Sequence, residues 1–441
     1  MRMATAIGLA AAVVAGIVVG GAKAAEPAKG GAAAKGGAPA KGGADARLDA
    51  VADAYVKLSL AIGRHDPLYV DAYYGPAEWK AEAERGAPRP LPELLARARA
   101  LLRETQAAPA SPRRAFLEKQ LVAAEAALRR MSGEKLTLAE EARLLFDVAP
   151  PPVPAATFEA ARARLEALLP GEGTLAARMQ AVRARVEVPR GKLPAVVDAV
   201  LAEVRRRAGT HVALPAGERF SVEYVKDQPW AAYNWYKGGY QSLIQVNTNI
   251  PMTVDGALEV LAHEGYPGHH VYNALLESRL VRGAGWREYT VYPLYSPQSL
   301  IAEGTANVGV DVLMTRAEQR AFVAATLAPL AGIKAEDLAA WERVKEAARP
   351  LRYAGGEAAR MLLDEGKPEA EVEAFLVRFG AAPDRAKQNI RFFRAYRAYI
   401  YTYTAGADLV EGWIGEGPDR AARFFALLDR PLVPSELTTK K

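Results

Sequence analysis

Three of the five histidines in this chain fall within eight consecutive residues, in the sequence His-Glu-Gly-Tyr-Pro-Gly-His-His from position 263 to position 270. A neutral imidazole is a common metal ligand, and a glutamate beside a metal-bound water can act as a general base. Histidine is scarce in this chain, so three histidines grouped around Glu264 indicate a metal site. The residue types therefore predict metal-dependent hydrolysis.

The spacing differs from the familiar H-E-x-x-H pattern, in which both histidines share one face of a helix. Pro267 occupies the position of the second histidine. His270 lies two helical turns after His263, so the two rings reach one ion only by leaning together. Pro267 and Gly268 favour a kink or bulge that could bring His269 round instead. We prefer His269 as the second ligand and keep His270 as the alternative; the other histidine would line the pocket.

We expect the third ligand from a later segment that opens at Gln298 and reads as a helix rich in small residues. Glu303 lies there among apolar neighbours, where a carboxylate needs a partner. Asn307 and Asp311 follow four and eight residues later, on the same helical face, and could orient the ligating histidines. For Asp311 a surface position is the stronger expectation.

The motif His-Glu-x-x-Pro-Gly-His-His, followed by Glu-Gly-x-Ala, resembles the bacterial family catalogued as domain of unknown function 885. Proteins of this family are similar to gluzincin-type zinc metallopeptidases, and their helical architecture resembles that of the oligopeptidase and carboxypeptidase Taq groups. The resemblance covers most of residues 46–435 and is densest at 233–311 and at Arg352-Tyr353-Ala354-Gly355-Gly356.

The resemblance implies a role for each matching residue. It implies His263 and His269 as metal ligands, with Glu303 as the remaining ligand. It also implies Glu264 as the base and a pocket role for Tyr353. The chain departs from the family at Thr305, directly after Gly304, where members commonly carry an aromatic residue. The departure concerns the shape of one pocket wall.

These observations predict a hydrolase with Zn²⁺ as cofactor and a peptide or small amide as substrate, although other first-row metals suit the same ligands. Zinc held by two imidazoles and one carboxylate keeps a position open for water and lowers the pKa of that water toward about 7. Glu264 would take the proton from this water and pass it to the leaving amine. Tyr353, Arg352 and His270 are candidate donors to the oxyanion.

Substrate contacts are expected from the segment before the histidine cluster. A strand predicted from Leu243 to Asn249 could pair, as an edge strand, with an extended peptide. Asn247 could anchor a substrate end, or it could simply be a turn residue; Arg352 is a second substrate-binding candidate. A row of tyrosines near the end of the chain is more typical of core packing than of a cleft wall. It consists of Tyr396, Tyr399, Tyr401 and Tyr403.

Two other functions fit the same residues. The site could hydrolyse a non-peptide amide or ester, or the protein could be a binding protein that holds zinc without catalysis. The presence of Glu264 argues against the second function, because ligand geometry alone does not require this carboxylate. The pattern favours no oligomeric state and does not separate endopeptidase from exopeptidase action.

The chain that positions these residues reads as mainly α-helical. Residues 46–207 are dominated by Ala, Leu, Arg and Glu, which are strong helix formers, and are interrupted by Pro-rich breaks at 149–152 and 169–171. Residues 65–76 read as a turn with aromatic side chains. Two strands are expected within 220–249, on either side of an aromatic, Gly-interrupted stretch. Thr253 or Asp255 is the expected N-cap of the helix that carries the histidines.

We therefore predict a large helical, metallopeptidase-like catalytic domain over 46–435, with a small β element at about 220–250 beside the active-site helix. The domain is divided into an N-terminal helical part, 46–215, and a metal-site part, 216–435. No later apolar stretch is long enough to span a bilayer.

The first residues are expected to direct export. Residues 1–25 combine a positive start, an apolar run and small residues at the end, which is typical of a signal peptide. Residues 26–45 repeat Ala, Lys, Gly and Pro and are predicted to be a flexible linker. The mature protein would then be periplasmic or secreted, with no stable membrane span.

Charge and cysteine content narrow the function further. The net charge is +6, and about half of it lies in residues 1–45, so the remaining chain is nearly balanced. No basic cluster with interleaved aromatics is present, which argues against a nucleic-acid partner. The chain has no cysteine, so it forms no disulfide and offers no thiolate ligand.

Overall fold

The computed structural model describes residues 43–228 and 230–438, and the predicted signal peptide and most of the predicted linker lie outside this range. The described chain is mainly α-helical, as the composition predicted. Both predicted Pro-rich breaks separate helices. The helices of the first half are α1 (Gly43–Ile62), α2 (Ala77–Glu84), α3 (Leu91–Gln106), α4 (Pro112–Met131), α5 (Leu138–Phe146), α6 (Ala155–Leu168), α7 (Leu175–Arg183) and α8 (Leu193–Ala208).

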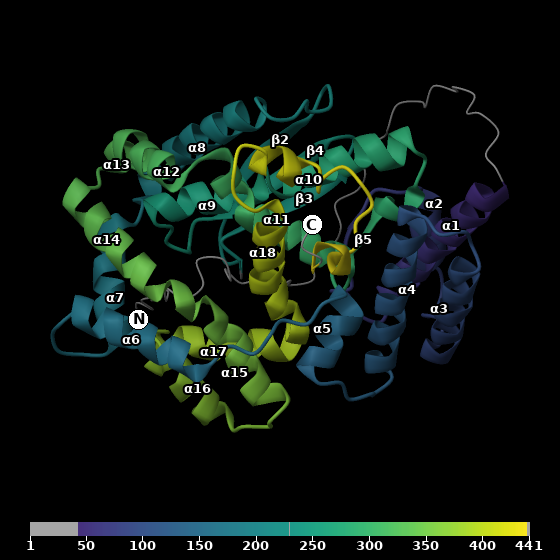
Figure 1. Cartoon of the computed structure of the whole chain (residues 1–441), viewed down its shortest axis with the longest axis horizontal. Coiled ribbons are helices and arrows are strands. Elements are labelled where there is room, and N and C mark those ends of the chain that lie inside the picture. Colours follow the sequence, from purple (N-terminus) through teal and green to yellow (C-terminus); the bar gives the residue numbers. More distant parts are fainter. Residues whose placement is uncertain (1–42, 229, 439–441) are drawn as a thin grey trace.

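The second half is also helical, and its helices surround a central pair that runs through the middle of the molecule (Figure 1). The central pair is α11 (Pro297–Leu313) and α18 (Ile400–Ile414). The others are α9 (Val254–Glu264), α10 (His269–Leu276), α12 (Arg316–Phe322), α13 (Ala328–Ala331), α14 (Ala335–Ala348), α15 (Ala354–Leu363), α16 (Glu369–Arg378), α17 (Pro383–Tyr396) and α19 (Arg420–Phe425).

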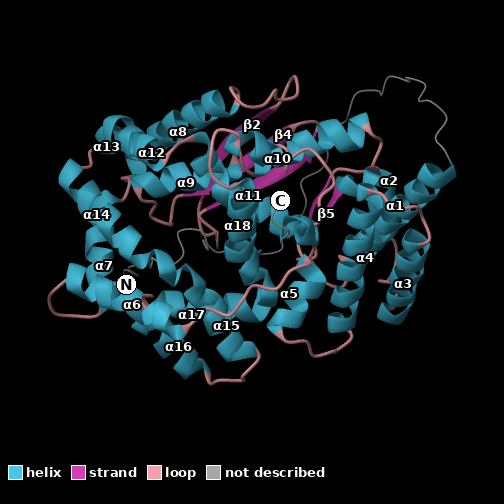
Figure 2. Ribbon diagram, viewed as in Figure 1, coloured by secondary structure: helices cyan, strands magenta, loops and turns pink. Residues whose placement is uncertain are grey.

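A three-stranded sheet lies beside the helices that carry the histidine cluster (Figure 2). Its strands are β2 (Arg219–Val225), β3 (Ala232–Gly238) and β4 (Gln241–Asn247). The aromatic stretch between the two predicted strands forms the additional strand β3, because the residues at 238–240 have positive φ angles and turn the chain back on itself. β4 pairs with β2 on one side and β3 on the other, so the predicted edge strand is the central strand.

A second sheet was not predicted. β1 (Val70–Tyr73) pairs antiparallel with β5 (Val291–Pro293). The segment of β1 was predicted to be a turn because only four residues have an extended conformation, and their partner is more than two hundred residues away. This pairing places β1 beside the start of α11, which follows β5 directly.

The two central helices pack in direct backbone contact because each has a glycine at the crossing point. A Cβ atom added to Gly304 of α11 would lie 2.4 Å from the carbonyl oxygen of Gly406 of α18. A Cβ atom added to Gly406 would lie 2.6 Å from the carbonyl oxygen of Leu300. Larger side chains would force the helices apart. Glu303 therefore sits immediately beside α18.

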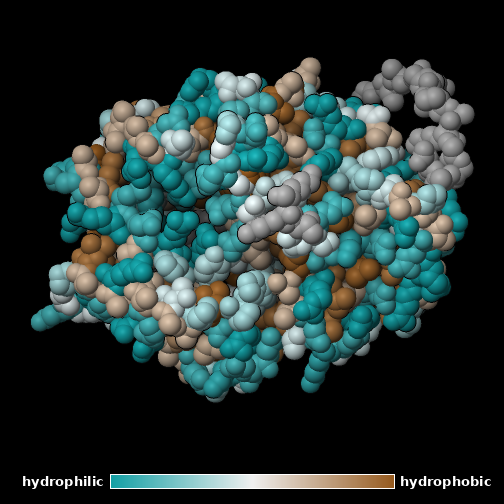
Figure 3. All heavy atoms as spheres, viewed as in Figure 1, coloured by the Kyte–Doolittle hydropathy of each residue, from teal (hydrophilic) through white to brown (hydrophobic). Residues whose placement is uncertain are grey.

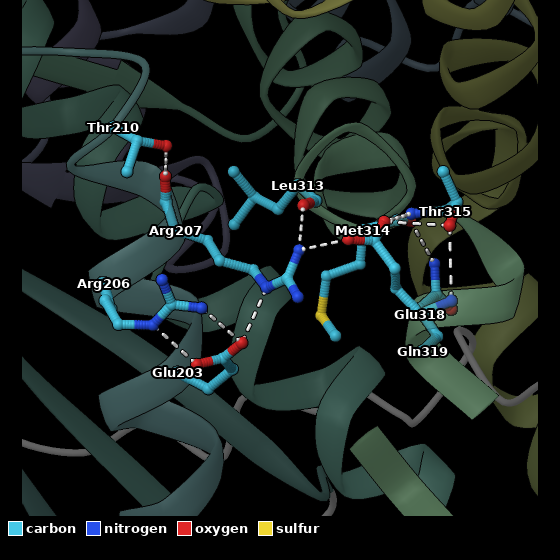
Figure 4. A network of polar contacts seen from close by, with 9 residues as sticks. All are labelled: Glu203, Arg206, Arg207, Thr210, Leu313, Met314, Thr315, Glu318 and Gln319. Carbon is cyan, nitrogen blue, oxygen red and sulfur yellow. Dashed lines mark hydrogen bonds and ion pairs between the residues drawn. The ribbon is translucent and has the colours of Figure 1, made fainter. Parts of the chain in front are cut away.

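The C-terminal end of α11 is held by α8 through a polar network (Figure 4). Arg207 of α8 donates to the carbonyl oxygen of Leu313 at 3.1 Å and pairs with Glu318 of α12 at 3.0 Å. Glu203 accepts from the same guanidinium at 2.7 Å. Thr315 caps α12 in a capping box with Glu318. These contacts fix the axis of α11, the helix that carries Glu303.

Three apolar clusters form the core. One of them joins α1 and α3–α5 to residues from β5, α11 and α15–α18, so it contains residues from both sides of position 215. The face seen in Figure 3 is largely hydrophilic, with apolar residues in small separate groups. No helix among the described residues has the length and apolar character needed to cross a membrane.

Candidate metal centre

The histidine motif lies at a complete break between two helices. Thr253 caps α9 by accepting from the backbone N–H of Gly256 at 3.1 Å, which settles the choice between the two expected N-caps. α9 then ends at Glu264, and α10 begins at His269. The kink or bulge expected at Pro267 is thus a break in the helix.

The break folds back so tightly that one position requires glycine. The N–H of Gly268 donates to the carbonyl oxygen of Ala262 at 3.1 Å. A Cβ atom at position 268 would lie 1.8 Å from the carbonyl oxygen of His263, a distance that no side chain tolerates. The break in turn packs on α11, where a Cβ atom at Gly309 would lie 2.7 Å from Pro267. Two glycines therefore bring the histidine motif against the helix of Glu303.

His263, His269 and Glu303 converge at this contact. One potential ligand atom from each lies within 4.8 Å of the other two. The Nε2 atom of His263 is 3.5 Å from Oε2 of Glu303, and Nε2 of His269 is 3.7 Å from Oε1. The two imidazole rings are perpendicular, with their centroids 4.5 Å apart. The three predicted ligands thus share one small volume.

Glu303 has one unsatisfied oxygen in this group. Its side chain is only 4 % exposed. Oε1 accepts a hydrogen bond from the hydroxyl of Tyr399 at 2.9 Å, whereas the buried Oε2 has no hydrogen-bond partner. Burial raises the pKa of Glu303 to about 8. A buried carboxylate oxygen without a donor is costly, and a cation at this position would remove the cost.

The two histidines are held in the form that binds metals. Burial lowers the pKa of His263 to about 4, and the neighbouring side chain of Asn307 acts in the opposite direction. Burial and the adjacent His263 lower the pKa of His269. Both rings are therefore neutral near pH 7, with lone pairs available. Two neutral imidazoles and one carboxylate form a donor set that suits a divalent first-row cation such as zinc.

Glu264 faces the same cavity. Burial raises its pKa well above the usual range, and the nearby carboxylates of Glu303 and Asp71 add to this effect. Its backbone carbonyl oxygen accepts from Nδ2 of Asn234 at 2.6 Å, which ties the end of α9 to β3. A carboxylate with a raised pKa, next to a metal site, has the properties of a general base.

The cavity has a volume of about 40 Å³, which provides space for a few water-sized molecules. Residues from both sheets, from α9, α10 and α11, and from the turn just before α18 surround it. They are Asp71, Ala72, Tyr233, Asn234, Tyr236, His263, Glu264, His269, Asn273, Tyr292, Leu294, Ala302, Glu303 and Tyr399.

His270 does not line this cavity, contrary to the pocket role predicted for it. Its Nε2 lies 2.8 Å from the carboxylate of Glu218, and its Nδ1 lies 2.9 Å from the hydroxyl of Ser242. The side chain is fully buried. Successive residues of a helix project about 100° apart, so the first two residues of α10 face different surroundings. His269 faces the candidate ligands, and His270 faces the sheet.

Asn247, which was predicted to anchor substrate, is also absent from the cavity. Its Nδ2 donates to the backbone carbonyl oxygens of Gln228 and Trp230, at 2.5 and 3.0 Å, and its side chain is buried. These contacts close the loop between β2 and β3. The structure thus places Asn247 in the structural role that was its alternative.

Arg352 and Tyr353 point to another part of the protein. Both side chains bind Asp408 on α18, at 2.6 and 2.9 Å respectively. Neither belongs to the lining of the cavity, so the structure does not bring the predicted oxyanion donor to the metal ligands. Asp311, for which a surface position was expected, is half-buried, with its side chain 16 % exposed and bonded to Arg316 and Gln319.

Several cavity residues had no signal in the sequence. Asp71 and Tyr233 lie on strands that were not predicted, and the Tyr233 hydroxyl donates to the Asp71 carboxylate. Tyr292 lies on β5, and its hydroxyl lies close to the side chain of Ser299. Tyr399 was identified only as one of four tyrosines favoured to be core, and it is both buried and bonded to Glu303. Only its position in the predicted aromatic row could have suggested it.

Comparison with protein-family models finds no match, and neither does comparison with curated proteins. The resemblance to domain of unknown function 885 therefore stays a prediction. Among solved structures, the chain is similar to a candidate lipoprotein from Colwellia psychrerythraea, with a TM-score of 0.46, 14% identity, and coverage of 79% of this chain and 68% of that chain. It is also similar to an M32 carboxypeptidase from Deinococcus radiodurans R1, with a TM-score of 0.37, 15% identity, and coverage of 89% and 93%. Similarity at this level carries no argument about activity.

Proposed function

We propose that this protein is a zinc-dependent metallopeptidase whose metal is held by His263, His269 and Glu303. The observation that supports the proposal most directly is the buried Oε2 of Glu303, which has no hydrogen-bond donor and is 3.5 Å from Nε2 of His263. Most buried carboxylate oxygens in native proteins have a hydrogen-bond partner. A divalent cation fills that need, and Glu264 beside it adds a group suited to proton transfer.

A bound divalent cation would supply Lewis acidity that polarises a substrate carbonyl and acidifies water. Glu264 accepts a proton on its carboxylate and delivers that proton to the leaving amine, a task for which its raised pKa is suited. Tyr399 holds Glu303 in place through its hydroxyl. Tyr292, which lines the cavity, is the proposed donor to the oxyanion in place of Tyr353.

The proposal extends to the whole chain. Residues 1–25 act as a signal peptide and residues 26–45 as a linker, so that residues 46–435 work outside the cytoplasm as the catalytic domain. The apolar clusters shared between residues before and after position 215 support a single catalytic body rather than two independent parts.

The first test is metal content. Elemental analysis of the purified, tag-free protein should find about one equivalent of zinc per chain. Glu303→Ala should lose the metal, because this variant removes the anionic ligand. Unchanged metal content in Glu303→Ala would remove Glu303 from the ligand set.

The second test separates catalysis from metal binding. Cleavage of a peptide library, followed by mass spectrometry, should show hydrolysis by the wild-type protein. Glu264→Gln should keep the metal and lose turnover by about 10²- to 10⁴-fold. Glu259→Gln is the matched control, because Glu259 lies on the same helix but interacts with Lys345 outside the cavity. Undiminished turnover in Glu264→Gln would eliminate the proposed base.

A further inference from the structure

We propose that Asp71 and Asn234 form a subsite for the free α-ammonium group of the substrate, so that the enzyme is an aminopeptidase. This inference rests on the proposed function, because it assigns a substrate class to the same site. It depends on the charges that line the cavity, on the position of Asp71 outside the group of candidate metal ligands, and on acceptor atoms without donors.

The cavity lining is strongly anionic. It contains three carboxylates, from Asp71, Glu264 and Glu303, and no lysine or arginine. Its two histidines belong to the candidate ligand group and would bind a cation as neutral rings. A divalent cation balances two of the three negative charges. One negative charge is left for the substrate to compensate, and an ammonium group compensates it, whereas a terminal carboxylate would be repelled.

Asp71 is the carboxylate that the rest of the chemistry does not use. The candidate ligand group in the described residues contains His263, His269 and Glu303, and Asp71 is not part of it. Yet Asp71 lines the same cavity as Glu264 and Glu303. It therefore lies beside the proposed reaction centre without binding the metal. A group that recognises the residue next to the scissile bond belongs at such a position.

Asp71 also lacks a cationic partner. One oxygen of its carboxylate accepts a hydrogen bond from the hydroxyl of Tyr233. Within residues 43–228 and 230–438, no lysine or arginine forms an ion pair with it. By contrast, the buried Glu288 pairs with Arg113 at 2.7 Å, and the buried Glu218 pairs with Arg205 at 2.7 Å. Asp71 is half-buried, and a half-buried carboxylate without such a partner is available to an incoming cation.

Asn234 supplies a second acceptor. Its Nδ2 is committed to the carbonyl oxygen of Glu264 at 2.6 Å, which fixes the orientation of the amide. Its Oδ1 is buried and has no hydrogen-bond partner. An ammonium group has three N–H donors and no acceptor, so it matches a free carboxylate oxygen and a free amide oxygen in one cavity. The fixed amide also links this subsite to the end of the helix that carries Glu264.

The test uses matched peptides and the full-length, zinc-loaded protein. One pair differs only in whether the N-terminus is free or acetylated, and a second pair differs only in whether the C-terminus is free or amidated. We expect kcat/KM to be at least about 100-fold higher for the free N-terminus, since a charged hydrogen-bonded contact is lost on acetylation. Amidation of the C-terminus should change kcat/KM by less than about threefold.

Asp71→Asn is the decisive variant. It should lower kcat/KM for the free peptide by at least about 30-fold and leave the acetylated peptide nearly unchanged, so that the preference collapses. Zinc content should stay at the wild-type level, which separates this effect from loss of the metal. Asp198→Asn, on the exposed face of α8, is the control and should retain the preference.

The source of the ammonium group is resolved by one further substrate, an acetylated peptide with lysine before the scissile bond. If this peptide is cleaved efficiently and Asp71→Asn abolishes that cleavage, Asp71 binds a lysine side chain and the aminopeptidase assignment is overturned. Efficient cleavage of all acetylated peptides would also overturn it while leaving the metallopeptidase intact. Absence of any peptide cleavage by the zinc-loaded protein would overturn the proposed function and this inference together.

Discussion

His269 and His270 are neighbours in the sequence, but they belong to two clusters that differ in how completely their polar atoms are paired. In the cluster of His263, His269 and Glu303, the buried Oε2 of Glu303 has no donor. In the cluster around His270, both ring nitrogens have partners, Glu218 and Ser242. Two adjacent histidines therefore have different surroundings: the carboxylate beside His269 keeps an oxygen without a donor, whereas the ring of His270 is fully paired.

The cluster around His270 has a structural role. Glu218 accepts from Tyr266 at 2.8 Å and pairs with Arg205 at 2.7 Å, in addition to its contact with His270. These interactions join α8 and β2 to both sides of the helix break. The hydrogen bonds and the nearby charges hold the pKa of Glu218 at about 2, against the effect of burial. The network therefore holds the break in the shape that directs His269 toward Glu303.

The largest expected effect is on zinc affinity, and it comes from removing His269, which lies beside the unpaired oxygen of Glu303. His269→Ala should lower zinc affinity by more than about 100-fold, which exceeds the effect typical of residues that only orient ligands. The variant should keep its fold, because the substitution breaks no completed hydrogen-bond network of the kind that surrounds His270. Competition with a zinc chelator measures the affinity, and circular dichroism checks the fold. Retention of wild-type affinity would exclude His269 as a ligand.

The neighbouring substitution should show the opposite pattern. His270→Ala leaves Glu218 and Ser242 in a buried site without one partner, so it should reduce the free energy of unfolding by about 3 kcal/mol. Zinc affinity should fall less than in His269→Ala. Denaturant unfolding of the metal-free protein measures the first quantity. A stable His270→Ala protein with no zinc would reverse the roles assigned to the two histidines.

The stability of the metal-free protein should also depend on pH through the cluster of His263, His269 and Glu303. The raised folded pKa of Glu303, about 8, means that the folded state keeps a proton that the unfolded state loses near its ordinary pKa. The unfolding free energy contributed by this group is therefore highest at low pH and is lost as pH rises to about 8. The buried histidines have lowered pKa values, so they act in the opposite direction, but only below about pH 6.5.

Between pH 6.5 and 8 the effect of the carboxyl groups is left. Glu303 alone should cost the metal-free protein roughly 2 kcal/mol of stability, and the raised pKa of Glu264 acts in the same direction. Glu303→Gln should reduce this slope, and saturating zinc should abolish it. Denaturant titrations at several pH values provide the measurement. A flat profile in the metal-free wild-type protein would show that Glu303 is ionised without a cation.

The smallest effect is expected outside both clusters. Tyr353→Phe removes a hydroxyl that contacts Asp408 and Arg352, away from the cavity. Peptide hydrolysis should change by less than about twofold, whereas Tyr292→Phe should slow it by at least about tenfold if Tyr292 donates to the oxyanion. A large loss in Tyr353→Phe would restore the role that the sequence suggested for this residue.

Much of the architecture followed from local sequence. Helix formers and Pro-rich breaks gave the mainly α-helical class, and Thr253 before an apolar pattern gave the start of α9. The strands were harder to predict, because β1 has four residues and its partner strand lies more than two hundred residues later. Asp71 was missed with β1, since a lone aspartate in a short segment carries no local signal.

Local sequence was enough to identify the available chemistry: scarce histidines gathered around one glutamate, a proline and glycine that end a helix, and a carboxylate in an apolar setting. The fold was needed to show which histidine faces Glu303 and which residues complete the cavity, because both depend on close packing between distant segments. Gly268 against His263, Gly309 against Pro267, and Gly304 against Gly406 set distances that no local pattern encodes.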